Sequence, residues 1–425
     1  MRAFPVILTI LFAGLAPAQQ TEHLPLVIHR FADKLGPKAL DLYEKLHVLA
    51  EPPGKEAKTA ALLAERLAAA GFKTSAEAWA PGFAAVARNG KGPCVLLRVE
   101  LDARPVPGGF AHTEAHDLHM AVVAAAAEIL DGIRSFWSGT LVVVAESDTA
   151  SGSGLQRMLR DGLMEKWGRP EAVLAFQADP RLPLGRVAAP MGPAFASRTN
   201  YEVTLRGRAG SPEHPEEAIN PVLLGTSFVQ GLQTLLAVEK SPVRRALISA
   251  GAFHSGRSAD TIPDRASLLL TLRCFDETVE KTLETRMRRR AESLWRATGL
   301  DESRRPTIAK RPGALPAVRN DPALAGRMIE AFVHHLGKPF LILGEGVPVL
   351  HAESFGFLAR EMPYGSGVFM FRLGCVTPES LSGSEEEGPP PALGSERFRP
   401  LAGPSIVFGT RVLCAAILAV MGRGQ

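Results

Sequence analysis

The sequence predicts an α/β protein in which a smaller α+β domain is inserted into a larger, doubly wound α/β domain. Three observations support this. Apolar, strand-like runs alternate with helical patterns along the first half of the chain. Near Ser197 the pattern changes to half-exposed strands and amphipathic helices, and from about Asn320 buried strand and helix patterns return. A chain that leaves one pattern and later resumes it predicts an inserted domain.

The larger domain is predicted from buried strands joined by helices. Residues 140–145 form a continuous β-branched run, which suits a central strand covered on both faces. Further strands are expected at residues 94–101, 172–177 and 368–373. Helical patterns cover residues 37–71, 120–133, 154–164 and 322–336. This alternation is typical of a doubly wound sheet.

The smaller domain is predicted as a sheet with helices on one face. Its expected strands are residues 200–206, 245–253 and 266–274, and its expected helices are residues 221–238 and 277–298. We therefore place the larger domain at residues 19–196 and 315–425, and the smaller one at residues 197–314.

Composition and charge exclude some classes of function. A chain of 425 residues can bury two sizeable cores. The net charge of +4 is small and no long block of like charges occurs, so nucleic-acid binding is not expected. None of the four cysteines forms a C-x-x-C pair, which excludes cysteine-type zinc sites.

The N-terminus predicts a cleaved signal peptide of residues 1–18. Arg2 precedes an apolar run over residues 4–15, and Ala16-Pro17-Ala18 supplies small residues for cleavage. The alternative is a short membrane anchor, but the run is too short to cross about 30 Å of hydrocarbon. Residues 405–421 are apolar but contain Arg411 and predict a packed helix. We expect an exported protein, periplasmic or secreted, with no membrane span after cleavage.

Three polar clusters adjoin the predicted strands and helices. Residues 98–105 end a buried strand. Residues 112–119 hold three histidines and two acids, which could bind a metal or could cap the following helix through Asp117. Glu146 follows an apolar strand, at the end where open α/β sheets place their sites. It could act as a general base, or belong to a capping loop.

The order of these clusters resembles peptidase family M20, and within it the amidohydrolases that cleave N-acyl amino acids. Residues 98–105 (R-V-E-L-D-A-R-P) resemble the family's R-A-D-M-D-A-L-P, and residues 112–119 resemble H-A-C-G-H-D-x-H. Residues 259–264 (A-D-T-I-P-D) resemble A-N-V-I-P-D. The resemblance extends from about Leu42 to the last helix. It implies a catalytic-type larger domain and a smaller domain that forms a homodimer.

The resemblance also implies a site of two metal ions with a glutamate as base. Glu114 takes the place of the family's cysteine, His116 matches the next histidine, and Glu146 matches the base. The remaining ligand and oxyanion positions have lost their functional groups: Ser147, Gln177, Ser211 and Gly394. The resemblance therefore implies a degenerate site in which Glu114 and His116 hold zinc or another divalent ion weakly, or no metal binds.

Two positions of the smaller domain resemble substrate contacts of the family. Arg273 matches a family arginine, and Asp260 stands where an asparagine often contacts substrate. Either could instead be a structural surface charge.

Three functional hypotheses remain open. The first is a working hydrolase of N-acylated amino acids or small peptides, in which substitute ligands such as Asp148, Asp179, His214 or His351 hold the metal. The degenerate site favours weak or no hydrolysis instead. The second is a non-catalytic protein that binds such a ligand or acts as a structural homodimer. The third is a metal-free hydrolase, although no Ser-His-acid arrangement is evident.

Overall fold

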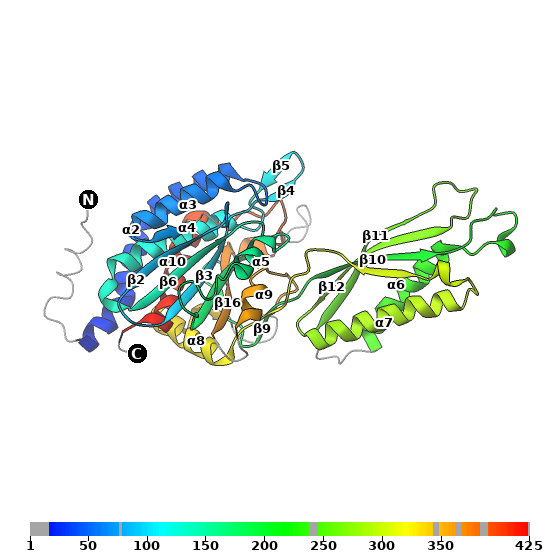
Figure 1. The fold of residues 1–425 in the computed structure, drawn as a ribbon. Helices are drawn as coiled ribbons and strands as arrows, with labels where there is room; N and C mark the ends of the chain where they lie inside the picture. Colours follow the sequence, from blue (N-terminus) through cyan, green and yellow to red (C-terminus); the bar gives the residue numbers. More distant parts are fainter. Residues whose placement is uncertain are drawn as a thin grey trace. The chain divides into compact units, whose positions relative to one another are not determined.

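The computed structural model of the chain describes residues 17–75, 79–238, 245–342, 348–362, 367–382 and 390–423, without the side chains of residues 17–22 and 238. The predicted signal peptide, residues 1–18, lies outside this range except for its last two residues. The chain divides into two compact units (Figure 1). Phe195–Val318 and Pro348–Gly356 form the smaller unit, and the rest forms the larger one.

The predicted domain boundaries lie within four residues of the two main crossings, at Ala194 and Val318. The sequence analysis assigned residues 348–356 to the larger domain, whereas the structure places Pro348–Gly356 with the smaller unit. Backbone hydrogen bonds explain this: the N–H of Ala196 donates to the carbonyl groups of Val349 and His351.

The larger unit is built on a mixed sheet whose described strands follow the order β1-β2-β6-β3-β7-β16-β8-β15. The central neighbours β6, β3, β7 and β16 are parallel, while β2 is antiparallel to β6 and β8 to β16. The strands are β1 (Lys73–Ser75), β2 (Phe83–Asn89), β3 (Cys94–Glu100), β6 (Gly139–Glu146), β7 (Ala172–Pro183), β8 (Val187–Ala188), β15 (Leu341–Ile342) and β16 (Val368–Val376).

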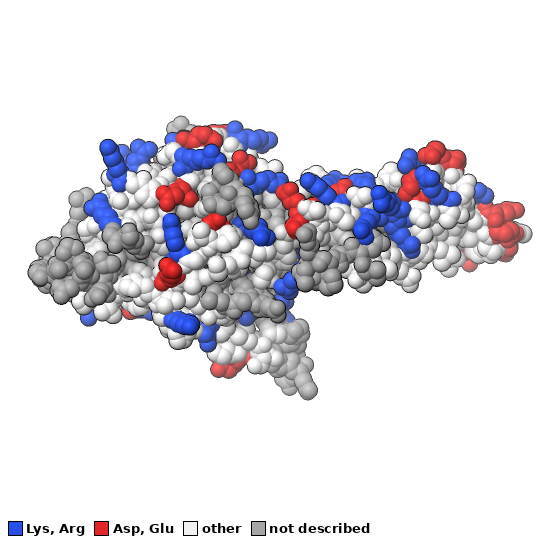
Figure 2. All heavy atoms as spheres, turned by 90° about the horizontal axis from the view of Figure 1, so that it is seen from below, with Lys and Arg blue, Asp and Glu red and all other residues white. Residues whose placement is uncertain are grey.

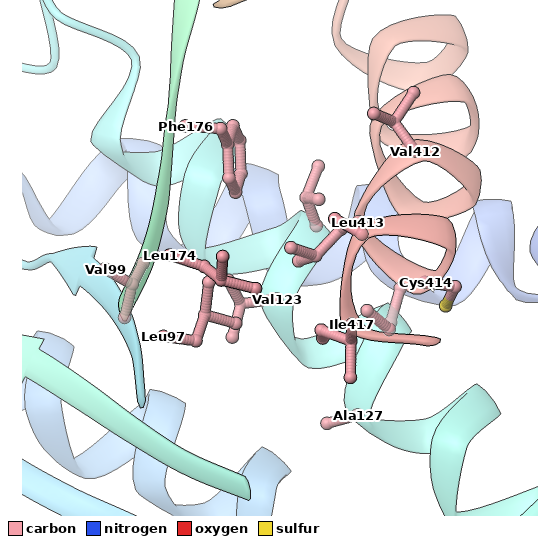
Figure 3. Packing of buried hydrophobic residues seen from close by; sticks show 14 of the residues in the cluster. Leu97, Val99, Val123, Ala127, Leu174, Phe176, Val412, Leu413, Cys414 and Ile417 are labelled. Carbon is pink, nitrogen blue, oxygen red and sulfur yellow. The ribbon is translucent and has the colours of Figure 1, made fainter. Parts of the chain in front are cut away.

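Helices of the larger unit cover this sheet, which confirms the predicted α/β fold class. Helix α4 contacts β3 and β7, α10 contacts β3 and β16, and α2 packs against both helices. Figure 3 shows side chains of α4 and α10 packed with those of β3 and β7. The helices are α2 (Pro17–Leu49), α3 (Ala57–Ala69), α4 (His116–Gly132), α5 (Ser153–Arg160), α8 (Pro322–Leu336), α9 (Gly356–Glu361) and α10 (Ala402–Met421).

Helix α10 is the described helix that is long and apolar enough to cross a membrane by length and composition. Of its most apolar stretch, 78% is buried inside the protein. It contributes Val412, Leu413 and Ile417 to the packing in Figure 3. Residues 405–421 therefore form a packed core helix, as the sequence predicted.

Helix α2 begins twenty residues before the predicted start at Pro37. An interior proline removes one backbone hydrogen bond and is unfavourable in a helix. In the structure Pro25 and Pro37 both lie inside the helix. Buried apolar side chains at helical spacing hold the additional turns against the core, namely Leu24, Ile28, Phe31 and Leu35.

Alternation along the central strands separates an apolar face from a polar one. On β3 the core takes Val95, Leu97 and Val99, whereas Arg98 and Glu100 point to the opposite face. The same alternation places Glu146 of β6 and Gln177 of β7 away from the core. Because β3 and β6 are parallel and pair Glu100 with Glu146, these polar groups meet at the carboxyl ends of the strands.

The smaller unit is an antiparallel sheet with the described order β11-β12-β10-β13. Helices α6 and α7 both contact β10 and β12, and the buried side chains of β10 alternate toward them. This confirms the predicted one-faced sheet. The elements are β10 (Thr199–Arg206), α6 (Pro221–Val238), β11 (Ala246–Ser255), β12 (Arg265–Cys274), α7 (Glu277–Arg296) and β13 (Thr307–Lys310).

Two pairs of short strands lie outside the main sheets. After β3, a hairpin is formed by β4 (Arg104–Val106) and β5 (Gly109–Ala111). Strands β9 (Pro193–Phe195) and β14 (Val318–Arg319) pair with each other at the residues that flank the smaller unit. Figure 2 shows basic and acidic side chains interspersed over the face in view.

Candidate functional site

A buried charge network lies at the carboxyl ends of β3 and β6. Arg98 Nε donates to Glu146 Oε2 at 2.8 Å, and the same guanidinium forms a second ion pair with Glu100. All three side chains are at most 1% exposed. Burial opposes ionisation of Glu100, but Arg98 and His119 outweigh it and lower the pKa of this carboxyl group. The network is therefore a charged cluster shielded from solvent.

His119 of α4 ties this network to the neighbouring strand. Its Nε2 accepts a hydrogen bond from the backbone N–H of Ala178 at 2.9 Å, and its Nδ1 lies 3.1 Å from Glu100 Oε2. Since Nε2 is the acceptor, Nδ1 carries the hydrogen and donates to Glu100. The imidazole is thus fixed at both nitrogens.

A second group of charges surrounds the start of α4. Arg104 donates to Glu114 Oε2 from Nε at 2.6 Å, with Nη2 at 2.5 Å, and from Nη1 to Asp102 Oδ2 at 3.3 Å. His116 Nδ1 lies 2.6 Å from the carbonyl oxygen of Asp102 and 3.2 Å from its carboxylate. His116 Nε2 lies 3.5 Å from Glu114 Oε2. The structure therefore brings both predicted ligands, Glu114 and His116, to one place.

Ionisation within this second group follows from its ion pairs. Burial opposes protonation of His116, but the hydrogen bonds to Asp102 and Glu114 outweigh it and raise the pKa of His116 well above its usual value. Burial likewise opposes ionisation of Asp102, yet His116, Arg104 and the Thr149 hydroxyl lower the pKa of this carboxyl group. The charged forms of His116 and Asp102 therefore stabilise each other in this group.

The loop before α4 turns through a left-handed residue. Ala115 has a φ of 60°, in the left-handed region that favours glycine, and it stands where the family's pattern has glycine. This backbone turn directs Glu114 and His116 toward each other across one residue.

Positions that carry further ligands in the family's pattern face other partners here. Ser147 Oγ donates to Glu56 Oε2 at 2.6 Å, and Gln177 Nε2 donates to the carbonyl oxygen of Glu114 at 3.0 Å. A Cβ atom at Gly394 would lie 3.7 Å from Glu114 Oε1. Gln177 and Gly394 therefore lie beside Glu114, as the resemblance implied, while Ser147 is engaged with the loop before α3.

The four residues considered as substitute ligands already have partners. Asp148 accepts from the hydroxyl groups of Ser151 and Ser153, and Asp179 forms a buried ion pair with Arg372. In the smaller unit, His351 Nε2 lies 3.1 Å from Glu353 and the exposed His214 lies 3.4 Å from Glu216. Within the described residues, no group of three or more His, Cys, Asp or Glu side chains is arranged to hold a metal ion.

The two predicted substrate contacts belong to the smaller unit. Arg273 Nη1 donates to the carbonyl oxygen of Leu350 at 2.7 Å, which ties β12 to the segment Pro348–Gly356. Asp260 is exposed, in a turn where its backbone N–H donates to Ser258 Oγ.

The sequence analysis gave no role to three residues that organise the site. Arg104 binds Asp102 and Glu114, Glu56 holds Ser147, and His47 Nδ1 lies 2.6 Å from Asp117 Oδ2. A signal was available for Arg104, because it stands where the family's pattern has leucine. Glu56 and His47 are remote from the site in sequence, and no local pattern marks them.

Comparison with known proteins decides the family. The model of Peptidase family M20/M25/M40 matches residues 96–389 of the chain. The chain belongs to the M20 family. M20 structures have a catalytic domain and an inserted dimerisation domain, to which the larger and smaller units correspond.

Relatives of this M20 protein include two enzymes and a solved structure. N-acetyl-L-cysteine deacetylase of Bacillus subtilis (strain 168) is 24% identical, over 77% of this chain and 78% of the enzyme. IAA-amino acid hydrolase ILR1-like 2 of Arabidopsis thaliana is 24% identical, over 81% and 80%. The crystal structure of Bacillus subtilis YXEP, described as a dinuclear metal binding M20 peptidase, has a TM-score of 0.71 at 22% identity and covers 91% of this chain and 98% of its own.

Proposed function

We propose that this M20 protein is of the N-acyl-amino-acid hydrolase type, with a degraded metal centre and weak or no hydrolysis. The state of Glu146 carries the proposal. A general base must reach the water that it deprotonates. Glu146 is fully buried, and its Oε2 is held by Arg98 Nε at 2.8 Å. If any hydrolysis occurs, Glu146 is the base that the family pattern assigns, and it must first leave this ion pair.

The side chains around Glu114 support the loss of the metal centre. A two-metal hydrolytic site needs several anionic or imidazole ligands to hold both ions and activate water. Glu114 and His116 supply two, but the other positions offer the neutral groups of Ser147 and Gln177 and the bare backbone of Gly394. These residues do not fit a dinuclear centre. At most, Glu114 and His116 would hold one zinc or other divalent ion weakly.

The ligand class follows from the relatives. One is named as a deacetylase of N-acetyl-L-cysteine and another as a hydrolase of an amino-acid conjugate. We infer a small N-acylated amino acid or peptide-like ligand, with Arg273 and Asp260 as its contacts in the smaller unit. Binding without turnover would make the protein a pseudoenzyme, the alternative to a weak hydrolase.

Two further proposals concern location and assembly. The leader pattern of residues 1–18 supports export to the periplasm or secretion. The described order of the smaller sheet ends at β11, and exposed apolar side chains lie on β11 and on the adjoining α6. Such a surface supports a homodimer formed through the smaller unit.

Metal content and hydrolysis, measured together, test the proposed function. The purified mature protein is dialysed against trace zinc, cobalt and manganese, and bound metal is measured by elemental analysis. N-acetyl and N-benzoyl amino acids and dipeptides are then screened for hydrolysis. We expect less than one ion per chain, removed by the substitution His116→Ala but kept in His214→Ala, because His214 is remote in sequence and exposed. About two ions per chain together with hydrolysis that a chelator abolishes would refute the proposal.

A further inference from the structure

We propose that Arg104 is the built-in cation of this site, and that its guanidinium takes the charge-neutralising place that a metal ion would fill between Asp102, Glu114 and His116. This inference rests on the proposed loss of the metal centre, and it assigns the replacement to one residue. Arg104 thereby excludes divalent cations from the ligands that remain.

The contacts of Arg104 are those expected of an internal counterion. Its Nε and Nη2 lie 2.6 and 2.5 Å from Glu114 Oε2, and its Nη1 lies 3.3 Å from Asp102 Oδ2. Asp102 is fully buried and the Glu114 side chain is only 12% exposed. Buried carboxylates require compensation by a cation or by hydrogen bonds. The Arg104 guanidinium supplies a positive charge and hydrogen bonds to the carboxylates of both Asp102 and Glu114.

His116 shows that the guanidinium lies where a metal ion would be bound. Metal-binding histidines usually have one ring nitrogen fixed by a carboxylate or carbonyl group, while the other faces the metal. His116 Nδ1 is fixed by the carbonyl and carboxylate groups of Asp102. Its Nε2, the atom left to face a metal, lies 3.5 Å from Glu114 Oε2, the same oxygen that Arg104 binds.

The hairpin of β4 and β5 positions Arg104 beside Asp102 and Glu114. Arg104 opens strand β4, and the hairpin pairs it with Ala111 of β5. The hairpin lies in sequence between Asp102 and Glu114, so the guanidinium can bridge the residues that flank it. The family's pattern has leucine at this position, where no charge would be supplied. The leucine-to-arginine exchange therefore accompanies the loss of ligands at Ser147, Gln177 and Gly394.

A fixed positive charge beside the ligands lowers their affinity for a divalent cation. The cation would have to displace the guanidinium from Glu114 or bind within a few ångströms of it, against like-charge repulsion. Replacing Arg104 with the family's leucine removes both obstacles. Lysine at the same position keeps the positive charge and is the matched control, although it loses the forked geometry.

Zinc and cobalt titration of three proteins tests the proposal: the wild type, Arg104→Leu and Arg104→Lys. Binding is followed by isothermal titration calorimetry and by the cobalt absorption spectrum. We expect the Arg104→Leu protein to bind zinc at least ten-fold more tightly than the wild type, and the Arg104→Lys protein to remain close to the wild type. Equal affinities in all three would overturn the proposal and leave the proposed loss of hydrolysis standing. Tight binding of two ions by the wild type would overturn both.

A second measurement covers the case in which Arg104→Leu folds but is too unstable for titration. If Arg104 compensates Glu114, the thermal destabilisation caused by Arg104→Leu should largely disappear when Glu114→Gln is added, because the carboxylate no longer needs a cation. Additive losses in the double variant would contradict the assignment. The double variant should also show no gain in zinc affinity, since it lacks the carboxylate ligand.

Discussion

At the scale of single residues, the ion pair between Arg98 and Glu146 must break before Glu146 can act as a base. Both side chains are buried, and Glu100 shares the guanidinium. Removing one partner of a buried ion pair leaves the other charge without compensation. A substitution at Glu146 is therefore expected to lower the free energy of unfolding whether or not the residue takes part in catalysis.

The substitution Glu146→Gln separates these two roles. We expect it to lower the free energy of unfolding by about 3 kcal/mol, because Arg98 loses one of its carboxylate partners. Urea denaturation of the variant and of the wild type measures the difference. The exposed Glu165→Gln is the matched control and should change stability by less than about 0.5 kcal/mol. A stable Glu146→Gln protein that has lost a measurable hydrolysis would favour catalysis as the main role of Glu146.

Glu114, His116 and Glu146 could be named from the sequence, but their contacts could not. The pattern of residues 112–119 located Glu114 and His116, and the position directly after the apolar run of residues 140–145 located Glu146. The pairing of Arg98 with Glu146 depends on β3 and β6 being parallel neighbours in register, and the two residues are far apart in sequence. The contact of Ser147 with Glu56 spans an even longer separation. Long-range polar contacts of this kind leave no local pattern.

At the scale of secondary-structure elements, long apolar segments were predicted well and short or interrupted ones were not. Strands β3, β6, β7 and β16 follow from continuous apolar runs that two covered faces require. Strand β2 and the hairpin of β4 and β5 were missed. Alanine is frequent in β2, and a three-residue strand has too few positions for a periodic pattern. The turns of α2 before Pro37 were also missed, and tertiary packing there outweighs the cost of the interior prolines.

Helices α2, α8 and α10 meet at a group of histidines that makes stability depend on pH. His335 of α8 is buried, next to the exposed His334, and it faces His29 of α2. Burial lowers the pKa of His29, and Arg411 of α10, which pairs with Asp33 of α2 at 2.5 Å, lowers it further. Burial, with His334 and His29, lowers the pKa of His335 to about 4.

We expect the free energy of unfolding to fall between pH 6.5 and pH 4 because of His335. In this window the unfolded chain takes up a proton at His335, whose ordinary pKa is 6.5, while the folded protein does not. The substitution His335→Leu should reduce this loss by about 2 kcal/mol, and the exposed His334→Gln should leave most of it unchanged. Urea titrations at pH 7, 5.5 and 4 measure the effect. Identical pH profiles for His335→Leu and the wild type would rule it out.

At the scale of the whole molecule, the smaller unit is the place to look for self-association. Leu223 of α6 is 65% exposed and Leu247 of β11 is 36% exposed, and α6 contacts β11. Apolar side chains beside β11, which ends the described order of the smaller sheet, favour isologous pairing of two copies.

Sedimentation equilibrium of the purified protein should therefore give twice the mass of one chain. We expect the double substitution Leu223→Glu and Leu247→Lys to shift the protein to monomer without loss of secondary structure, because both side chains are exposed in the single chain. The substitution Val48→Lys on α2, at a residue that is 84% exposed in the larger unit, is the control and should leave the dimer intact. A monomeric wild type at micromolar concentration would argue against this surface.

The order of strands in the larger sheet has a consequence for how the protein is made. Strand β16 lies between β7 and β8, although β8 ends at Ala188 and β16 begins only at Val368. The ribosome therefore synthesises most of the chain before β16. Until β16 is made, the edge of β7 that it will cover can pair with other chains. A prematurely terminated chain would aggregate. For the exported protein proposed above, the same delay would leave the larger sheet incomplete until nearly all of the chain is available for translocation.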